Sequence, residues 1–282
     1  MRSLATHARA ANLGGHVAAV TGAASGLGRA LAMALSRSGV TLALADIDER
    51  GLGDVVAEVR RSGATAEGCV VDVTDAGAVN EWARATMDQF AGVHMIWNVA
   101  GIINAGDVLQ SSLADIERLM AVDFWGVVHG TKAFLPHIIA SGGGCVVNVS
   151  SAFGLLSAPA YGSYNAAKFA VRGWTDALRQ EMRLAGHPVS VTCVYPGGVR
   201  TPIMTNSTST AGLDDARRRR EVFDTRVART DPDRAAAVIL RAVAAGRPRV
   251  LVGVDAHLAD LLARFTGTRY ERLVEFVGRR RR

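Results

Sequence analysis

The sequence predicts an α/β protein built on a doubly wound, seven-stranded parallel sheet with helices on both faces. Apolar, β-rich runs alternate with helical patterns along almost the whole chain, as in successive βαβ units. Runs such as 17–20 and 145–149 lack polar alternation, which is typical of strands covered on both faces. The 30 glycines and 49% hydrophobic residues suit a well-buried core with many tight turns.

The elements follow from the periodicity of the apolar residues. Strands are expected at about 16–21, 41–45, 65–71, 94–98, 145–150, 189–194 and 249–252. Helices are expected between them, at 26–38, 49–62, 76–90, 112–141, 161–185 and 231–245. Asp231 followed by Pro232 marks a helix start, with Asp as the N-cap and Pro in the first turn.

At 282 residues the chain fits one large domain. We assign residues 15–254 to it, with an N-terminal arm at 1–14 and a helical C-terminal extension with a basic tail at 255–282. Residues 201–230 are long, polar and rich in Ser, Thr and Arg, so they predict a substrate loop with a short helix. The apolar spacing within 255–278 predicts one or two amphipathic helices docked on the body or on a neighbouring subunit.

The formal net charge is +6, but the way the charge is distributed indicates no specific nucleic-acid partner. The excess lies in two blocks, 217–220 and 279–282, without interleaved aromatic residues, and these look like a solvated loop and a frayed tail. No apolar run reaches the roughly 20 residues of a membrane span, and the first residues lack the apolar segment of a secretory signal. Three cysteines without ligand spacing indicate reduced core residues, no metal site and a cytoplasmic protein.

A glycine-rich turn follows the first expected strand at Thr21–Gly28 and opens a helix. Gly22 permits the tight turn, and Gly26 and Gly28 permit close approach of a phosphate and packing of helix on strand. The helix N-terminus supplies free N–H groups and the positive end of the helix dipole. The context predicts a Rossmann-type dinucleotide site.

Asp46 ends the second expected strand, where a carboxylate accepts hydrogen bonds from the adenosine ribose hydroxyls and repels a 2′-phosphate. Neither Ile47 nor the turn residue Ser25 is basic, and Arg29 is expected to face outward. NAD is therefore favoured over NADP. Without the glycine turn, it would be equally reasonable to interpret Asp46 as an ordinary loop residue beside a helix cap.

Ser151, Tyr164 and Lys168 form a candidate acid/base group. Tyr164 and Lys168 are four residues apart, so they share one face of a helix. A phenol titrates near pH ~10, and a fixed cation beside it favours the phenolate and lowers its pKa. Ser151 alone would read as a turn residue at a strand end.

Together these motifs resemble the short-chain dehydrogenase/reductase family over about Gly15 to Val254. The turn matches TGxxxGxG, and the Ser, Tyr and Lys stand at the family's spacing. The resemblance implies a single-domain Rossmann fold, NAD-dependent hydride transfer between a secondary alcohol and a ketone, and a homodimer or homotetramer. In oxidation Tyr164 takes the alcohol proton, Ser151 hydrogen-bonds the substrate oxygen, and Lys168 binds the nicotinamide ribose.

The resemblance also implies further cofactor contacts. Asp72-Val73 is similar to the pair that contacts adenine, and residues 98–101 are similar to the NNAG motif, with Val99 in place of the second Asn. Residues 196–201 resemble the PGxVxT segment that holds the nicotinamide carboxamide. The cofactor set is therefore Gly22, Ser25, Gly26, Leu27, Gly28, Asp46, Ile47, Asp72, Val73, Asn98, Ala100, Gly101, Tyr164, Lys168, Pro196, Gly197, Val199 and Thr201.

Asp123 departs from the family pattern, which has an Asn on the long fourth helix at this distance before the Ser. The family's Asn stabilises a helix kink and helps hold a water that links the Lys to solvent. Asp adds a negative charge that is expected to pair with Lys168, raise its pKa and weaken its effect on Tyr164. We expect reduced but not abolished activity, and count Asp123 with the catalytic group.

The expected substrate is a lipophilic small-molecule alcohol or ketone. The predicted pocket walls, 102–108, 152–160, Tyr195 and 203–213, are mostly apolar near Ser151, and no fixed cation is evident for a carboxylate or CoA phosphate. Two alternatives remain: an NADP-dependent carbonyl or 3-oxoacyl reductase, and a noncatalytic NAD-binding family member.

Overall fold

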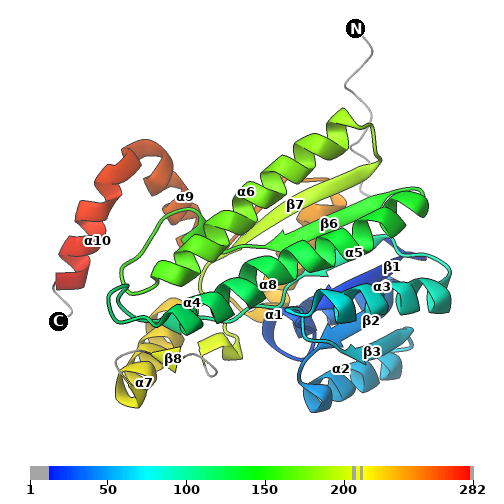
Figure 1. Cartoon of the computed structure of the whole chain (residues 1–282), viewed down its shortest axis with the longest axis horizontal. Helices are drawn as coiled ribbons and strands as arrows, with labels where there is room; N and C mark the ends of the chain where they lie inside the picture. The colour runs from blue at the N-terminus through cyan, green and yellow to red at the C-terminus, as the bar shows by residue number, and fades with distance from the viewer. Residues whose placement is uncertain (1–12, 205–207, 210–211, 280–282) are drawn as a thin grey trace, which may run out of the picture.

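The computed structural model describes residues 13–204, 208–209 and 212–279. Its main sheet has seven parallel strands in the order β3-β2-β1-β4-β6-β7-β9 (Figure 1). These strands are β1 (Val17–Thr21), β2 (Thr41–Asp46), β3 (Ala66–Val70), β4 (Met95–Asn98), β6 (Gly144–Val149), β7 (Val189–Pro196) and β9 (Arg249–Val252). The predicted fold class is confirmed, and each strand lies within about two residues of its predicted bounds.

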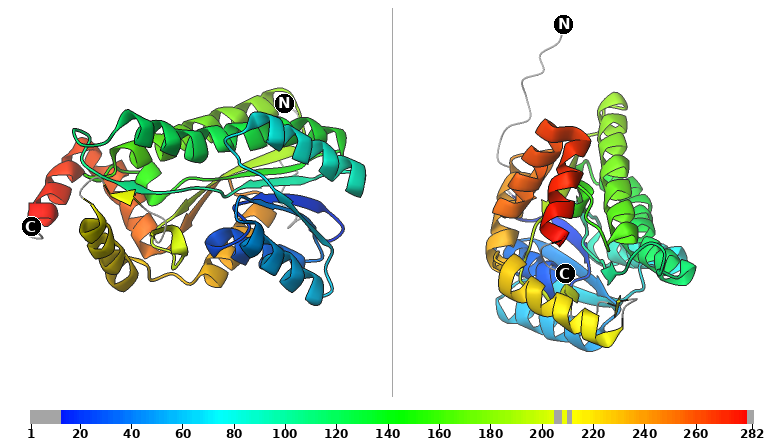
Figure 2. Two further views of the ribbon diagram at one scale, coloured as in Figure 1. Left: turned by 60° about the horizontal axis from the view of Figure 1, so that its bottom comes forward. Right: turned by 90° about the vertical axis from the view of Figure 1, so that its left-hand side faces the viewer.

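Helices cover both faces of the sheet (Figure 2). One face carries α1 (Gly26–Ser36), α2 (Glu49–Arg61) and α8 (Pro232–Ala244). The other carries α3 (Ala76–Phe90), α5 (Gly126–Ala140) and α6 (Gly162–Leu184). The predicted start of α8 is confirmed, because the Asp231 side chain accepts hydrogen bonds from the next two backbone N–H groups after Pro232.

The strands are apolar throughout because successive side chains enter two different cores. In β1, Ala18 and Val20 pack into the core under α1 and α8, whereas Val17 and Ala19 pack into the core under α3 and α5. All five residues of the strand are buried. A sheet covered on both faces places its functional groups at the ends of the strands, where loops emerge.

The predicted single helix at 112–141 is interrupted. It consists of α4 (Leu113–Met120), a π-helical turn (Ala121–Trp125) and α5, which together form a continuous rod (Figure 1). A π-helical turn accommodates one extra residue and often marks a functional position. It contains Asp123, the residue that departs from the family pattern.

Residues 201–230 contain the predicted short helix, α7 (Leu213–Val222), followed by a π-helical turn (Phe223–Val227). A short strand, β8 (Thr208–Ser209), pairs with β5 (Asn104–Ala105), which joins this segment to the chain after β4. The arginine block at 217–220, predicted as a solvated loop, lies instead on α7, and Arg217, Arg218 and Arg220 are exposed there.

The chain after β9 forms two helices, α9 (Val254–Thr266) and α10 (Tyr270–Arg279), where the sequence predicted one or two. Ala256 is fully buried against the body, and Asp260 pairs with Arg249 of β9 at 2.7 Å. Of the helices that the structure describes, none is long and apolar enough to cross a membrane.

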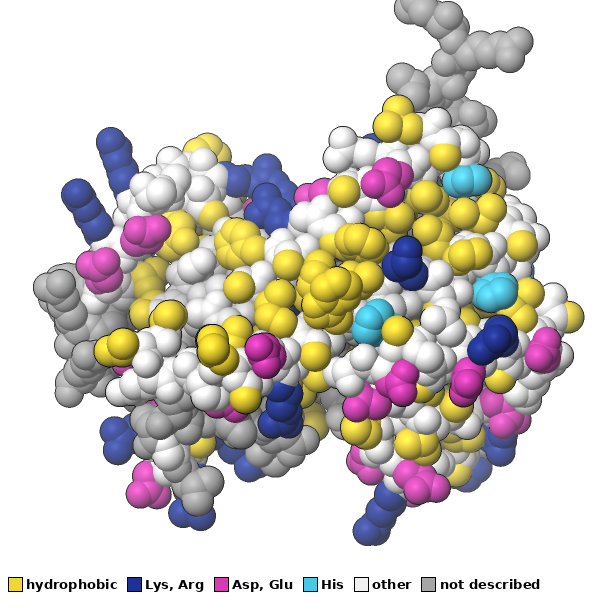
Figure 3. All heavy atoms as spheres, in the orientation of Figure 1, with side chains coloured by type: hydrophobic (Ala, Val, Ile, Leu, Met, Phe, Trp, Pro, Cys, Tyr) yellow, Lys and Arg dark blue, Asp and Glu magenta, His cyan; other side chains and the backbone are white. Residues whose placement is uncertain are grey.

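Exposed apolar side chains gather on the face formed by the α4–α5 rod and α6 (Figure 3). Trp125, in the π-helical turn, keeps 51% of its surface exposed, and Phe169 on α6 keeps 38%. Large apolar side chains together on a surface often mark a contact with another protein chain.

Candidate active site

A cavity of about 700 Å³ opens where β1, β4, β6 and β7 end. In a doubly wound sheet, ligands bind at the carboxyl ends of the strands. Most of the predicted site residues line this cavity: Gly22, Ser25, Gly26, Leu27, Gly28, Asp46, Ile47, Asp72, Val73, Ala100, Gly101, Ser151, Tyr164, Lys168, Pro196, Gly197, Val199 and Thr201. Residues far apart in the sequence are thus brought together in one place.

The backbone of the glycine turn packs closely against the backbone of the segment after β4 and against itself. Gly22 has a φ of +68°, and a Cβ there would come within 2.8 Å of the Ala100 backbone. A Cβ on Gly28 would overlap the carbonyl of Gly22. Ser25, the N-cap of α1, makes no side-chain capping hydrogen bond. The N–H groups that open α1 are therefore available to an anion at the cavity.

The Asp46 carboxylate is fixed at the end of β2. It accepts hydrogen bonds from the backbone N–H of Ala24 at 2.9 Å and of Asp48 at 3.0 Å. Arg29 donates instead to Glu58 of α2 at 2.6 Å. The prediction that Arg29 faces away from the cavity is confirmed, because it is not among the lining residues.

Ser151, Tyr164 and Lys168 meet at the opposite part of the cavity. Ser151 follows β6, and its Oγ accepts from the Phe153 N–H at 3.2 Å. The Ser151 side chain also lowers the pKa of the Tyr164 phenol. Tyr164 and Lys168 lie in the first two turns of α6, and the Lys168 Nζ is 5.5 Å from the centre of the Tyr164 ring. Both side chains are buried, with 6% and 4% of their surfaces exposed.

The predicted pairing of Asp123 with Lys168 is confirmed. The Asp123 Oδ2 is 3.0 Å from the Lys168 Nζ, and Asp123 is fully buried. Its Oδ1 accepts from the Ile102 N–H at 2.7 Å, and the ammonium also donates to the Val149 carbonyl at 3.3 Å. Asp123 therefore ties the π-helical turn to the segment after β4 and to α6.

Burial and charge act in opposite directions on these groups. Burial favours the neutral form of Lys168, but the charges of Asp123 and Tyr164 outweigh it, so the pKa of Lys168 is raised, as predicted. Burial also raises the pKa of Tyr164, Lys168 lowers it, and Asp123 raises it again. The net pKa of Tyr164 is raised, whereas the sequence predicted that Lys168 would bring it down. The prediction left out desolvation of the phenol.

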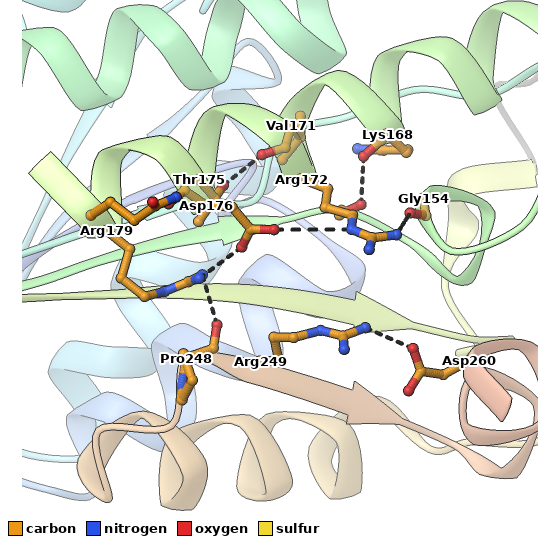
Figure 4. Close-up of polar contacts among 12 residues, drawn as sticks. Gly154, Lys168, Val171, Arg172, Thr175, Asp176, Arg179, Pro248, Arg249 and Asp260 are labelled. Carbon is orange, nitrogen blue, oxygen red and sulfur yellow. Dashed lines mark hydrogen bonds and ion pairs between the residues drawn. The ribbon is translucent and has the colours of Figure 1, made fainter. Parts of the chain in front are cut away.

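Two hydrogen bonds fix the segment that carries Ser151 to the helix that carries Tyr164 (Figure 4). The Ser150 hydroxyl donates to the Lys168 carbonyl at 2.8 Å. Arg172 donates to the Gly154 carbonyl at 3.3 Å, and Asp176 lies 4.0 Å from its guanidinium. The relative position of the two segments is therefore held by hydrogen bonds from side chains to backbone carbonyls.

Asn98 is the predicted cofactor residue that lies outside the cavity. Its side chain is 2% exposed and donates to the Asn148 Oδ1 at 2.8 Å and to the Thr131 Oγ1 at 3.2 Å. A Cβ on Gly130 would overlap it. Asn98 thus joins β4, β6 and α5 beneath the site, a support that the motif alone did not reveal.

The predicted substrate walls are partly correct. Ile102, Ile103, Ala152, Phe153 and Ile203 line the cavity. The assignment of Tyr195 is wrong: it is fully buried and packs with Leu155 and Cys193. Residues 193 and 195 of β7 point to the same face of the sheet, so Tyr195 enters that small core and not the cavity.

Sequence reasoning missed several other lining residues, and four of them add apolar surface or charge to the cavity. Phe223 and Val227, from the π-helical turn after α7, add apolar walls. Arg118 of α4 is a cation at the cavity, where none was expected. Asp255 comes from α9, beyond the predicted domain boundary. No motif marks these four positions, and only the folding of α4, α7 and α9 around the cavity brings them there.

Within the described residues, no group of three or more His, Cys, Asp or Glu side chains is arranged to hold a metal ion. Cys145 and Cys193 are buried, Cys69 is half-buried, and all three are free thiols.

Sequence comparison relates the chain to known dehydrogenases. The model of the family described as short chain dehydrogenase matches residues 16–212. A putative oxidoreductase, SadH, of Mycobacterium tuberculosis is 51% identical over 260 residues, which cover 92% of this chain and 94% of that protein. The 2,5-dichloro-2,5-cyclohexadiene-1,4-diol dehydrogenase LinX of Sphingobium indicum is 37% identical and covers 69% of this chain and 77% of its own length.

Solved structures show the same architecture. A short-chain dehydrogenase/reductase from Burkholderia phymatum in complex with NAD superposes with a TM-score of 0.83 at 31% identity, covering 90% of this chain and 92% of its own. Levodione reductase gives a TM-score of 0.76 at 26% identity, covering 88% and 98%.

Proposed function

Because the chain belongs to the short-chain dehydrogenase/reductase family of oxidoreductases, we propose that it uses NAD to interconvert a secondary alcohol and a ketone on a lipophilic small molecule. The observation that carries this proposal is the single cavity lined by the glycine turn, Asp46 and the Ser151–Tyr164–Lys168 group. The turn proposed to bind the phosphates and the phenol proposed to exchange the proton both line this cavity.

The residues of the cavity fit a dinucleotide. The turn at Gly22 leaves no room for a side chain, and the opening N–H groups of α1 suit a pyrophosphate. The segments 72–73, 100–101 and 196–201 would hold the adenine and nicotinamide ends, as the family resemblance implies. When bound, the nicotinamide ring donates or accepts the hydride.

The cofactor preference is proposed to be NAD. The Asp46 carboxylate would accept from the ribose hydroxyls and repel a 2′-phosphate. Arg29, the cation nearest to the turn in sequence, is held 2.6 Å from Glu58 and away from the cavity. The complex of the Burkholderia phymatum relative with NAD supports the same preference.

Tyr164 is proposed to exchange the proton with the substrate oxygen. Its raised pKa keeps it a neutral phenol near neutral pH, the form that donates a proton to a carbonyl oxygen during reduction. Ser151 is placed to hydrogen-bond the same oxygen and stabilise the charge that develops on it. Oxidation needs the phenolate, so alcohol oxidation is expected to accelerate as the pH rises, while ketone reduction is favoured at lower pH.

Lys168 and Asp123 are proposed to set the pKa of the Tyr164 phenol. The Lys168 ammonium favours the phenolate, and the Asp123 carboxylate weakens that effect. Lys168 is also proposed to hold the nicotinamide ribose, as the family resemblance implies. The pair sets the pH range in which Tyr164 changes its protonation state.

The substrate is proposed to be lipophilic because the cavity wall near Tyr164 is apolar. Ile102, Ile103, Phe153, Ile203 and Phe223 supply it. The names of two relatives, a cyclohexadiene-diol dehydrogenase and levodione reductase, support an alcohol or ketone as the reacting group.

Assembly of two or four copies is also proposed. The face of the α4–α5 rod and α6 exposes Trp125 and Phe169 (Figure 3), and such a face suits a two-fold contact. Light scattering on the purified protein would give the mass, and Trp125→Glu is expected to shift it toward the monomer. A monomeric wild-type protein would contradict the proposed assembly.

A panel of secondary alcohols with NAD and of ketones with NADH tests the proposed function. We expect turnover on apolar members of the panel, followed as the change in NADH absorbance, and weaker turnover with the NADP pair. NADH binding without turnover on any member would support the noncatalytic alternative. Preference for NADPH would support the NADP-dependent reductase.

A further inference from the structure

Asp255 is a carboxylate at the cavity that the family motifs do not account for. It lies in the first turn of α9, after the last strand of the sheet, and it lines the same cavity as Tyr164. The N-terminal turn of a helix is a favourable place for a negative charge. The position in the helix therefore favours the charged form of this side chain, which lines the cavity.

The Asp255 carboxylate binds the backbone of the segment proposed to hold the nicotinamide. Its Oδ2 accepts from the Gly198 N–H at 2.6 Å. A short hydrogen bond to an ionised acceptor is stronger than a neutral one. The contact joins residues 57 positions apart in sequence, so it fixes the segment 196–201 to the C-terminal extension.

The rest of that segment is held by backbone bonds on each side of the Asp255 contact. The Gly197 N–H donates to Val252 at 2.9 Å, and the Gly198 carbonyl accepts from the Thr230 N–H at 3.0 Å. The Gly198 N–H donates to the Asp255 side chain, whereas the neighbouring groups bond to backbone partners. Removing the carboxylate would leave the Gly198 N–H without this partner, in a segment whose neighbouring groups stay hydrogen-bonded.

Close packing leaves the carboxylate little freedom. A Cβ on Gly197 would overlap it, and a Cβ on Gly253, whose φ is +94°, would come within 2.5 Å of its Oδ1. Glycines on two sides of Asp255 thus make room for the carboxylate between the end of β7 and the end of β9. The carboxylate fills the space that these glycines leave.

We propose that Asp255 is a positioning residue for the cofactor, which holds the Gly197–Gly198 backbone in the shape that receives the nicotinamide end of NAD. The proposal rests on the proposed function, because it assumes that a nicotinamide dinucleotide occupies the cavity. It makes the C-terminal extension part of the cofactor site and not only a surface addition.

Binding of NADH, followed by its fluorescence, tests the proposal without a known substrate. Asp255→Ala is expected to raise the dissociation constant about tenfold, as for the loss of one hydrogen bond to a charged acceptor. Asp255→Asn keeps an oxygen that accepts from the Gly198 N–H, so its dissociation constant should stay within about twofold of wild type. Amide exchange in the peptide covering 196–201 should accelerate in Asp255→Ala and not in Asp255→Asn.

Asp260→Ala is the matched control on the same helix. Asp260 binds Arg249 at 2.7 Å and Arg264 at 2.9 Å, and it is not among the cavity-lining residues. Its loss should lower the melting temperature and leave the NADH dissociation constant unchanged. This control separates a general weakening of the extension from an effect on the cofactor segment.

Two results would overturn the inference in different ways. If wild type binds NADH and Asp255→Ala binds it equally well, with unchanged exchange at 196–201, Asp255 does not position the cofactor segment. If wild type binds neither NADH nor NADPH, the proposed function fails, and the inference fails with it.

Discussion

At one end of the cavity the backbone itself forms the wall, whereas at the other end the wall consists of side chains from separate segments. Around the glycine turn, the backbones of Gly22 and Ala100 are so close that a single Cβ would not fit. Around Tyr164, the wall is made by side chains such as Phe153, Ile203 and Phe223. The glycine turn therefore tolerates few residue types, whereas the wall near Tyr164 tolerates other apolar side chains of suitable volume.

This difference matters for function. A backbone cradle that presents N–H groups binds the phosphates shared by all dinucleotides, so its sequence requirements are strict. A side-chain wall decides which substrate fits, and it changes with each substitution. We therefore expect substitutions at the first end to abolish cofactor binding, and substitutions at the second end to change the Michaelis constant.

Gly22→Ala should have the largest effect on binding. The new Cβ would meet the Ala100 backbone, and a φ of +68° is unfavourable for Ala. We expect a loss of about 1–3 kcal/mol in the free energy of unfolding and a large loss of NADH affinity. Calorimetry and fluorescence titration would measure the two.

Gly53→Ala is the control for Gly22→Ala. Gly53 lies within α2, and nothing lies within 4 Å of the Cβ it would gain. Alanine is the better helix former by about 1 kcal/mol, so this variant should be slightly more stable and bind NADH normally. Equal NADH affinity in the two variants would contradict a backbone-built cradle.

Asp123→Asn should change stability and pH dependence together. It removes one partner of a buried ion pair, which costs roughly 3 kcal/mol of folding free energy. It also removes a negative charge that raises the pKa of Tyr164, so that pKa should fall. The rise of alcohol oxidation with pH should therefore shift to lower pH.

Rate against pH, measured for both Asp123→Asn and wild type, checks this shift. Asn retains an oxygen that accepts from the Ile102 N–H, so the backbone contact should persist. An unchanged pH profile in a folded variant would show that Asp123 does not influence Tyr164.

Asp46→Ala should reduce the preference for NADH over NADPH by about tenfold, the effect expected from hydrogen bonds to a charged acceptor. The measurement is the ratio of the two dissociation constants. Arg29→Ala serves as the control, because Arg29 pairs with Glu58 at a partly exposed site and should leave the ratio unchanged. A change in Arg29→Ala and none in Asp46→Ala would reverse the assignment.

Phe223→Ala should have the smallest effect. The side chain lines the cavity from the π-helical turn, so its removal should raise the Michaelis constant of an apolar substrate several-fold. The dissociation constant of NADH should not change. An effect on NADH alone would place Phe223 at the cofactor end.

The same difference explains what the sequence could predict. Gly22, Asp46, Tyr164 and Lys168 carry requirements of backbone shape or charge that leave a pattern in the sequence, and the structure places all four at the cavity. The seven strands were predictable for a similar reason, since a sheet buried on both faces needs continuous apolar runs.

Other positions left no such pattern. Phe223 is one apolar residue among many, and Asp255 reaches Gly198 only because α9 returns to the end of β7. Tyr195 was misassigned because strand direction alone does not say which face meets the cavity. The raised pKa of Tyr164 depends on how deeply the ring is buried, which spacing does not reveal.

Tyr164→Phe tests the central claim, that one cavity both binds NAD and exchanges the substrate proton. The account predicts that NADH still binds, because the other cofactor residues remain, with turnover lowered by at least about 10²-fold, the usual contribution of a proton-transferring group. Tyr161→Phe, which alters a neighbouring ring that packs on Phe153, should keep its turnover. Full turnover in Tyr164→Phe, measured with any substrate that the wild-type protein converts, would contradict the account.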